Sequence, residues 1–433
     1  MSGPPPGATG TVDPFAASPR TLGFDPSDPA FVADPYPAYA RLRADHPLLW
    51  NPDTRQWLVS RFGDVNALLR DRRLGRTYLH VATHEQLGHD SPPEWQDPFW
   101  RLVQSGMLDR EPPDHTRLRR LVAKAFTPAT VEGLRPAIDA IVDGLLAAAI
   151  GMGDFDLIAD VAEPLPVTVI AELLGIPEAD RHLLRPWSSD ICLMYELNPP
   201  EASQRRSVAA SLAFGDYLRD LARRRRAHPG DDLISALAQV AEAGDVLTED
   251  ELVGTCALLL NAGHEASVNG TGNAWWTLFR HPDALARLRS DPSLVPTAIE
   301  ELLRFDTPLP MFERWVLEEI ELYGVTIPRG AELALQFASA NRDPDGFDRV
   351  DELVLDRRPN PHISFGAGIH YCLGAPLAKL EMGILFREIL ARLPGLELRE
   401  SPAWKPTFVL RGLESLPVSV GRASPAPRGA AAG

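Results

Sequence analysis

A lone cysteine in a glycine-rich segment constrains this chain more than any other feature. Residues 365–374 read Phe-Gly-Ala-Gly-Ile-His-Tyr-Cys-Leu-Gly, and a helical pattern over residues 376–393 follows directly. We expect a tight loop that opens a helix, so that backbone N–H groups and the positive end of the helix dipole lie near the sulfur of Cys372. Both lower the pKa of a thiol and stabilise its thiolate. Glycine also lets the backbone approach a flat ligand where a Cβ atom would collide, and the segment holds Gly366, Gly368 and Gly374.

The remaining cysteines indicate a reducing compartment. Cys192, Cys256 and Cys372 are far apart and odd in number, so they can build neither a disulfide framework nor a C-x-x-C metal site. The first ten residues have no basic start and no apolar run of the kind that export requires, and no stretch reaches the roughly 18 to 20 apolar residues of a membrane span. We therefore expect a cytoplasmic protein without a membrane segment. A net charge of −16 also opposes binding to nucleic acid.

Apolar periodicity predicts a mainly α fold with a small β-sheet portion. The chain has 433 residues, 45% of them hydrophobic, which is enough to enclose a cofactor. Apolar residues recur at helical spacing over residues 116–126, 131–149, 207–221, 249–278 and 376–393. Shorter strand patterns cover residues 56–60, 315–322, 334–337, 407–410 and 416–420. We expect a single domain over residues 19–422, between flexible tails rich in proline, glycine and alanine at residues 1–18 and 423–433.

The cysteine segment resembles the haem-binding pattern F-x-x-G-x-x-x-C-x-G of the cytochrome P-450 family. Phe365, Gly368, Cys372 and Gly374 match its fixed positions, and His370 fits the bacterial variant. The resemblance implies the fold of that family, a haem b cofactor (iron protoporphyrin IX) and Cys372 as the thiolate ligand of its iron. It also implies a soluble bacterial haem-thiolate monooxygenase.

Two further elements resemble the family. His115 and Arg119 are four residues apart, on one helical face, and the resemblance implies that they hold the haem propionates together with Arg314 and His370. Glu301 and Arg304 resemble the E-x-x-R element, whose structural ion pair Arg357 is expected to complete. Without the resemblance, a solvated basic helix face would be the better interpretation of His115 and Arg119.

Residues 262–267, Ala-Gly-His-Glu-Ala-Ser, resemble the element of the family that activates dioxygen, with one departure. Gly263 permits a local opening of the helix, and Glu265 is the expected acid. Where the family usually has a threonine, this chain has Ala266, which removes a hydroxyl that helps deliver protons. Ser267 cannot simply replace it, because one residue along a helix rotates a side chain by about 100°. We expect a substrate hydroxyl or an ordered water to take over the proton relay.

The resemblance implies a monooxygenase that inserts one oxygen atom of O2 into an organic substrate. No dinucleotide-binding loop or iron–sulfur motif is visible in the sequence, so a ferredoxin and its NAD(P)H-dependent reductase are the implied donors. Basic residues at 117, 120 and 124 predict a dock for the ferredoxin. The predicted pocket residues are Leu259, Ala262, Leu309, Pro310, Met311, Phe312 and Leu410.

These mostly apolar pocket residues favour a mid-sized, largely apolar substrate, such as a hydroxylated natural product, a lipid or a xenobiotic. Other functions stay open at this stage. One is a peroxide-dependent or oxidative-coupling enzyme of the same haem-thiolate kind. Others are a haem-binding sensor without turnover, and a structural helical protein in which the motif is accidental.

Overall fold

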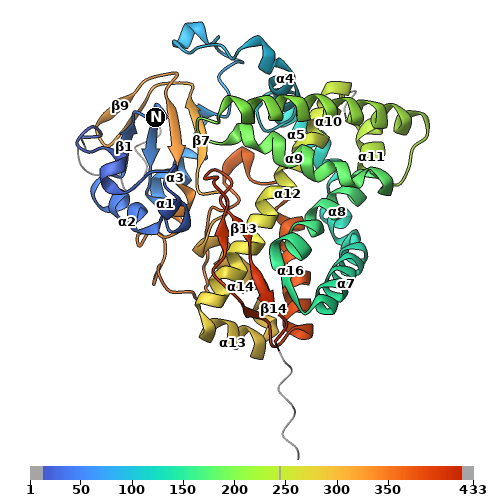
Figure 1. Cartoon of the computed structure of the whole chain (residues 1–433). Helices are drawn as coiled ribbons and strands as arrows, with labels where there is room; N and C mark the ends of the chain where they lie inside the picture. The colour runs from blue at the N-terminus through green and yellow to red at the C-terminus, as the bar shows by residue number, and fades with distance from the viewer. Residues whose placement is uncertain (1–12, 243–244, 422–433) are drawn as a thin grey trace, which may run out of the picture.

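The computed structural model describes residues 13–242 and 245–421. Figure 1 shows a strand-rich part, which includes β1, β7 and β9 and is covered by α1 to α3, beside a larger helical part. The predicted mainly α fold with a small β portion is confirmed. Within the described ranges, no helix combines the length and the apolar character that a membrane crossing requires.

The α-helices are α1 (Pro29–Ala33), α2 (Tyr36–Asp45), α3 (Phe62–Leu68), α4 (Asp97–Ser105), α5 (Asp114–Ala125), α6 (Pro128–Gly133), α7 (Arg135–Met152), α8 (Pro164–Leu174), α9 (Leu184–Cys192), α10 (Glu201–Ala227), α11 (Leu233–Gln239), α12 (Glu249–Arg280), α13 (Pro282–Ser290), α14 (Val295–Phe305), α15 (Phe337–Ala340) and α16 (Ala375–Arg392). The strands are β1 (Leu48–Asn51), β2 (Gln56–Val59), β3 (Leu74–Gly75), β4 (Asp154–Asp156), β5 (Ala241–Glu242), β6 (Asp245–Val246), β7 (Phe312–Val316), β8 (Ile320–Leu322), β9 (Val325–Ile327), β10 (Glu332–Leu335), β11 (Glu397–Leu398), β12 (Ala403–Trp404), β13 (Leu413–Ser415) and β14 (Pro417–Ser419).

The 32-residue helix α12 runs through the helical part and is buried along most of its length. It begins with a capping box in which Thr248 and Glu251 satisfy each other's backbone N–H groups. Helices α4, α8, α9 and α10 pack against it. A helix that is apolar on most faces is stable only when other elements surround it, so α12 forms one wall of any site in this core.

The largest sheet has the strand order β1-β2-β10-β7-β3. The hairpin of β1 and β2 is antiparallel, β10 lies parallel to β2, and β7 runs antiparallel to β10. In this register Leu333 lies opposite both Trp57 and Arg314. Strand β7 thereby carries Arg314 to the boundary between the sheet and the helical core.

The prediction of a strand at residues 407–410 is wrong. These residues form a turn, whose backbone N–H groups at Phe408, Val409 and Leu410 donate to the carboxylate of Glu196 at 2.8, 3.0 and 3.0 Å. Burial raises the pKa of Glu196, whereas these N–H groups lower it. A single remote carboxylate therefore overrides the alternating pattern that suggested a strand.

The predicted tails need one correction. Residues 1–12 and 422–433 lie outside the described residues, but residues 13–18 do not behave as a tail. The carbonyl of Pro14 accepts a hydrogen bond from the backbone N–H of Trp50 at 3.0 Å. The ring of Phe15 packs edge-on against Trp57 at 5.8 Å between centroids. These contacts attach the segment to the β1–β2 hairpin.

Candidate active site

A cavity of about 660 Å³ lies between α12 and the Cys372 loop. Cys372, His370 and Phe365 border it from the loop, and Ala262 and Ala266 border it from α12. The predicted cysteine segment and the predicted oxygen-activating segment therefore border the same cavity.

The Cys372 loop folds back on itself before α16 begins. The backbone N–H of Cys372 donates to the carbonyl of Phe365 at 3.0 Å, and Gly366 and Gly368 have positive φ angles of 69° and 71°. A Cβ atom at Gly368 would lie 2.3 Å from the carbonyl oxygen of Leu69. Gly368 does not border the cavity. The close approach to Leu69 therefore requires a glycine at this position, and the role of Gly368 beside a flat ligand stays a prediction.

The backbone N–H groups predicted to lower the pKa of the Cys372 thiol are present, but burial outweighs them. Burial raises this pKa, and the backbone N–H groups of Gly374 and Ala375 act in the predicted direction without offsetting the burial. These N–H groups lie at the start of α16, as the sequence indicated. A metal cation bound at the sulfur would further stabilise the thiolate.

The end of the cavity beside the Cys372 loop carries several basic side chains. His115 is 2% exposed, and neither ring nitrogen has a hydrogen-bond partner. Burial lowers the pKa of His115 to about 4, with further lowering by His370 and Arg119. Arg119 itself donates to the carbonyl of Tyr371 at 2.6 Å. Buried polar groups without partners are costly, so the His115 ring requires a hydrogen-bond partner that the polypeptide does not supply.

Arg314 and His370 complete this end. Arg314 is 3% exposed, and its guanidinium donates a hydrogen bond to the carbonyl of Glu313 at 2.8 Å. Burial, followed by the charge of Arg76, lowers the pKa of Arg314 to about 9. His370 Nε2 lies 3.3 Å from the Glu111 carboxylate. Among the described residues, Arg314 makes no ion pair with a carboxylate, which leaves its charge for an anionic ligand.

The α12 wall differs in part from the prediction. Ala262, Gly263, Ala266 and Ser267 all border the cavity, yet the helix runs through Gly263 without interruption. A Cβ atom at position 263 would meet the side chain of Ile170 in α8 at 3.1 Å. The expected local opening is therefore absent, and the glycine permits the close packing of α8 against α12.

Glu265, the expected acid, is turned toward other partners. Its carboxylate accepts hydrogen bonds from Ser189 at 2.7 Å and from the Lys405 ammonium at 2.8 Å. Burial acts to raise the pKa of Glu265, but Lys405, His264 and Ser189 outweigh it and hold the pKa below its ordinary value. Glu265 does not border the cavity. It is therefore an ionised, paired carboxylate behind the cavity wall.

Comparison with known proteins identifies the family. The cytochrome P450 sequence profile matches residues 188–403. Cytochrome P450 monooxygenase PikC of Streptomyces venezuelae is 39% identical over 93% of this chain and 95% of its own length. The chain belongs to the cytochrome P450 family. A second relative, 6-deoxyerythronolide B hydroxylase of Saccharopolyspora erythraea, is 38% identical over 90% of this chain and 96% of its own length.

Solved structures agree with this membership. The cytochrome P450 PksS of the bacillaene polyketide synthase of Bacillus subtilis 168 is 38% identical, covers 92% of this chain and 100% of its own, and has a TM-score of 0.84. This cytochrome P450 is therefore a monooxygenase with haem b as its cofactor. The sensor without turnover and the accidental motif, both open on the sequence alone, are set aside.

The residues of this cytochrome P450 fit haem. Cys372 would ligate the iron, and His115, Arg119, Arg314 and His370 would hold the two propionates, since arginine suits carboxylates through its forked donors. The test of this fit is the buried His115 ring, whose two nitrogens have no partner within the protein. When bound, a thiolate-ligated haem supplies the oxidising chemistry by which such enzymes attack unactivated carbon.

The structural ion pair of this cytochrome P450 assembles as expected. Arg304 donates to Glu301 through Nε at 2.8 Å and through Nη2 at 2.9 Å. Arg357 Nε donates to the same carboxylate at 2.8 Å. The side chains of Glu301 and Arg304 are fully buried and that of Arg357 is 7% exposed. The backbone N–H of Val354 adds a further donor, so the buried charges are fully paired.

Five of the seven predicted pocket residues border the cavity: Leu259, Ala262, Leu309, Phe312 and Leu410. Pro310 and Met311 do not, and this prediction is corrected. Met311 is fully buried in a separate cluster with Phe24, Phe31 and Phe408. Successive side chains of an extended segment point to opposite sides, so Phe312 and Met311 face different cores.

Sequence reasoning missed several residues that shape the site. Glu111 holds His370, Lys405 and Ser189 hold Glu265, and Glu196 holds the turn that carries Leu410 into the cavity. None of them belongs to a recognisable motif. A charged residue inside an otherwise apolar stretch, such as Glu196 in the segment Cys-Leu-Met-Tyr-Glu-Leu, was the available signal.

Proposed function

We propose that this monooxygenase hydroxylates a mid-sized, largely apolar natural product, inserting one oxygen atom of O2 with electrons from a ferredoxin. The observation that carries the proposal is the cavity wall opposite Cys372. Its members Leu258, Leu259, Leu309, Phe312 and Leu410 are apolar and come from three separate parts of the chain. An apolar wall binds a substrate mainly through the burial of apolar surface. The cysteines at 192, 256 and 372 are free thiols. Free thiols are typical of a reducing compartment, which supports a cytoplasmic localisation.

The relatives support the class of substrate. One is named as a hydroxylase of 6-deoxyerythronolide B and another belongs to the bacillaene polyketide synthase. Both likenesses cover nine-tenths or more of this chain, and so include both walls of the cavity. The names of these relatives and the apolar wall of the cavity both support a hydroxylated natural product as the class of substrate.

The α12 wall supports a proton relay that depends on the substrate or on water. Ala266 offers no hydroxyl, and Glu265 is engaged by Lys405 and Ser189 behind the wall. A hydroxyl of the substrate, or an ordered water between the substrate and Ser267, would supply the missing donor. This requirement favours substrates that already carry a hydroxyl group near the oxidised carbon.

The proposed electron donor is a ferredoxin served by an NAD(P)H-dependent reductase. The dock predicted on α5 has to be revised, because Arg117 is held by Asp245 at 3.3 Å and by Glu251. The exposed side chains Ile369 and Tyr371 lie within three residues of Cys372, at 48% and 41% exposure. An apolar contact there, next to the thiolate, supports docking of a small redox protein on this face.

A binding screen tests the proposal. A library that spans macrolides, fatty acids, steroids and small polar compounds is scanned for the shift of the ferric Soret band. Compounds that shift it are then turned over under ¹⁸O2 with a ferredoxin and its reductase, and we expect one labelled oxygen in the product. Leu410→Phe narrows the cavity and should weaken binding, whereas Leu212→Phe, at an exposed position of α10, should not. Binding of small polar compounds alone would contradict the proposal.

A further inference from the structure

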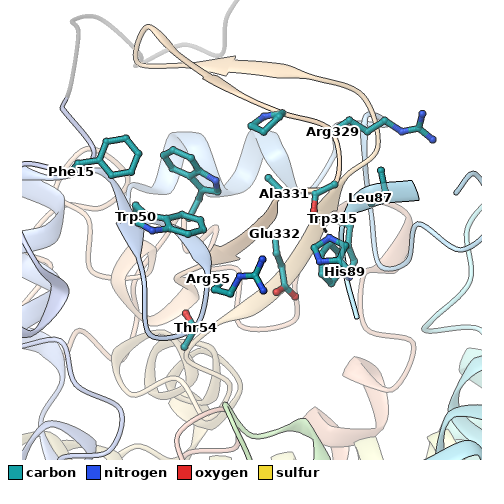
Figure 2. Close-up of a pocket in the computed structure, with 13 residues that line it drawn as sticks. Phe15, Trp50, Thr54, Arg55, Leu87, His89, Trp315, Arg329, Ala331 and Glu332 are labelled. Carbon is teal, nitrogen blue, oxygen red and sulfur yellow. Dashed lines mark hydrogen bonds between the residues drawn. The ribbon is translucent and has the colours of Figure 1, made fainter. Parts of the chain in front are cut away.

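A second cavity, of about 590 Å³, lies against the β1–β2 hairpin and is walled by aromatic rings (Figure 2). Trp50 belongs to β1, Trp57 to β2 and Trp315 to β7. Phe15 comes from the N-terminal segment, and His89 comes from the loop before α4. Three of the nine tryptophans of the chain therefore line this one cavity.

These rings support one another. The centroids of Trp50 and Trp57 are 5.2 Å apart, and those of His89 and Trp315 are 4.9 Å apart, both in edge-to-face arrangements. Tyr78 packs behind Trp315 at 4.7 Å. His89 is further held by a hydrogen bond between Nε2 and the carbonyl of Gly330 at 2.8 Å. Because each ring is braced by a neighbour, the wall is a preformed aromatic surface.

A carboxyl group points into this aromatic cavity. Glu332 is the first residue of β10, and Figure 2 shows its side chain between Arg55 and the ring of His89. Within the described ranges no cationic side chain forms an ion pair with it. Burial and the charge of Glu313 raise the pKa of Glu332 to about 8, against smaller opposite effects of Gln56 and Arg76.

The two arginines of the cavity lie at its rim and are exposed. Arg329 donates to the carbonyl of Val81 at 3.0 Å and points away from the cavity in Figure 2. Arg55 belongs to the turn between β1 and β2. It is the one cation that faces Glu332 in this view.

The aromatic cavity adjoins the active site. Thr54, Trp315 and Glu332 border both the aromatic cavity and the active-site cavity. A molecule that extends past these three residues would have one end in each space.

We infer that the aromatic cavity is an outer substrate subsite that binds an organic ammonium group between the tryptophan faces and the Glu332 carboxylate. Aromatic faces attract cations through the negative potential above the ring, and cages of this kind recognise alkylammonium ions. The apolar remainder of the substrate would extend past Trp315 toward α12. The inference rests on the proposed function, since it concerns the substrate of the same enzyme, but its test needs no turnover.

The test compares choline with its neutral isostere 3,3-dimethylbutan-1-ol in the haem-loaded protein, by calorimetry at pH 8.5. Choline has no nitrogen lone pair, so it cannot ligate iron. We expect choline to bind at least about ten-fold more tightly than the alcohol, and Glu332→Gln to remove about that factor while the affinity for the alcohol stays within about two-fold. Equal affinities in the native protein would overturn the inference.

The pH dependence provides a second readout. Choline affinity should rise between pH 7 and pH 9 as the Glu332 carboxyl ionises, because its pKa is about 8, and should be flat in Glu332→Gln. The other charged or titratable groups that face this region are Glu313, Arg76, Arg55, Arg329, His89 and Tyr78. Arg55→Gln removes the competing cation and should raise choline affinity. If neither Glu332→Gln nor Arg55→Gln altered the affinity for choline, the subsite would be contradicted.

A matched control is Glu318→Gln, at an exposed glutamate just beyond β7 that does not border the aromatic cavity. It should leave choline binding unchanged. If choline binding fails while natural products still shift the Soret band and are hydroxylated, only the subsite is wrong. If choline binds as expected but no hydroxylation is found, only the proposed function is wrong.

Discussion

The two walls of the active-site cavity are built in different ways. On the Cys372 wall, ten consecutive residues form the loop. Beside it lie the buried His115 ring, whose nitrogens have no hydrogen-bond partner, and the buried Arg314 guanidinium, which makes no ion pair with a carboxylate among the described residues. On the α12 wall, Glu265 is satisfied by Ser189 and Lys405 and takes no part in lining the cavity. The Cys372 wall therefore offers basic groups to an anionic ligand, whereas the carboxylate on α12 is already paired within the protein.

This difference separates cofactor binding from proton handling. A flat dianionic cofactor requires donors that remain unpaired in the protein, and these are present on the Cys372 side. Proton delivery requires groups whose pKa is set by their surroundings, and on α12 those surroundings come from elements far away in the sequence. The Cys372 wall should therefore respond to substitution by losing the cofactor, and the α12 wall by changing its pH dependence.

The largest effect is expected at Cys372. Cys372→Ser removes the thiolate, so the reduced, carbon monoxide-bound protein should lose the strongly red-shifted Soret band and hydroxylation should cease. The measurement is a difference spectrum of reduced protein with and without carbon monoxide. Cys256→Ala, at a buried cysteine away from the cavity, is the control and should keep the band. A persistent thiolate band in Cys372→Ser would refute the assignment of the Cys372 wall.

The scaffold that leads to the Cys372 loop should be the next most sensitive. Arg357→Ala leaves part of the Glu301 carboxylate unpaired in the interior, which should lower the free energy of unfolding by about 3 to 5 kcal/mol. Urea denaturation measures this change. Arg287→Ala breaks the Arg287–Asp356 pair at 2.7 Å, in which both side chains are 49% exposed, and should change stability little. Equal losses of unfolding free energy in the two variants would show that the buried ion-pair cluster stabilises the fold no more than an exposed pair does.

On the α12 wall, the expected signature is a pH dependence. The pKa of Glu265 lies below its ordinary value of 4.5 in the folded protein, so its pairing stabilises the fold above that value and is lost as pH falls through the lowered pKa. Lys405→Met leaves a buried carboxylate without its cation and should cost about 2 kcal/mol near pH 7.

The gap in stability between the native protein and Lys405→Met should narrow toward acid pH and close below the lowered pKa. Urea denaturation at a series of pH values measures it. Lys379→Met is the comparison, because Lys379 pairs with Glu300 at 2.6 Å in a setting where both side chains are about a third exposed. A gap for Lys405→Met that is independent of pH would show that Glu265 is not the group responsible.

The smallest effect is expected at Ala266. If a substrate hydroxyl or a water already completes the relay, Ala266→Thr should change the coupling of NAD(P)H oxidation to product by less than about two-fold. Ser267→Ala, which removes the nearby hydroxyl on the cavity wall, is the companion variant. A strong improvement of coupling in Ala266→Thr would show that no substitute relay exists.

Much of the fold was predictable from short-range patterns. The helices α5, α12 and α16 follow from apolar periodicity and from starts such as the capping box at Thr248. The turn at residues 407–410 was not predictable, because Glu196 holds it from about half the chain away. The place of Phe15 was likewise missed, since composition alone suggested a tail and the contact with Trp57 is tertiary.

The sequence by itself determined the Cys372 loop and with it the family and its haem cofactor, because these depend on identities within ten consecutive residues. The same residues predict Cys372 as the iron ligand. Only the tertiary structure decided which groups on α12 are free to act. Lys405 and Glu265 are 140 residues apart, yet their contact at 2.8 Å sets the charge state of the carboxylate. A pKa depends on through-space distance and burial, and neither is written in the order of the residues.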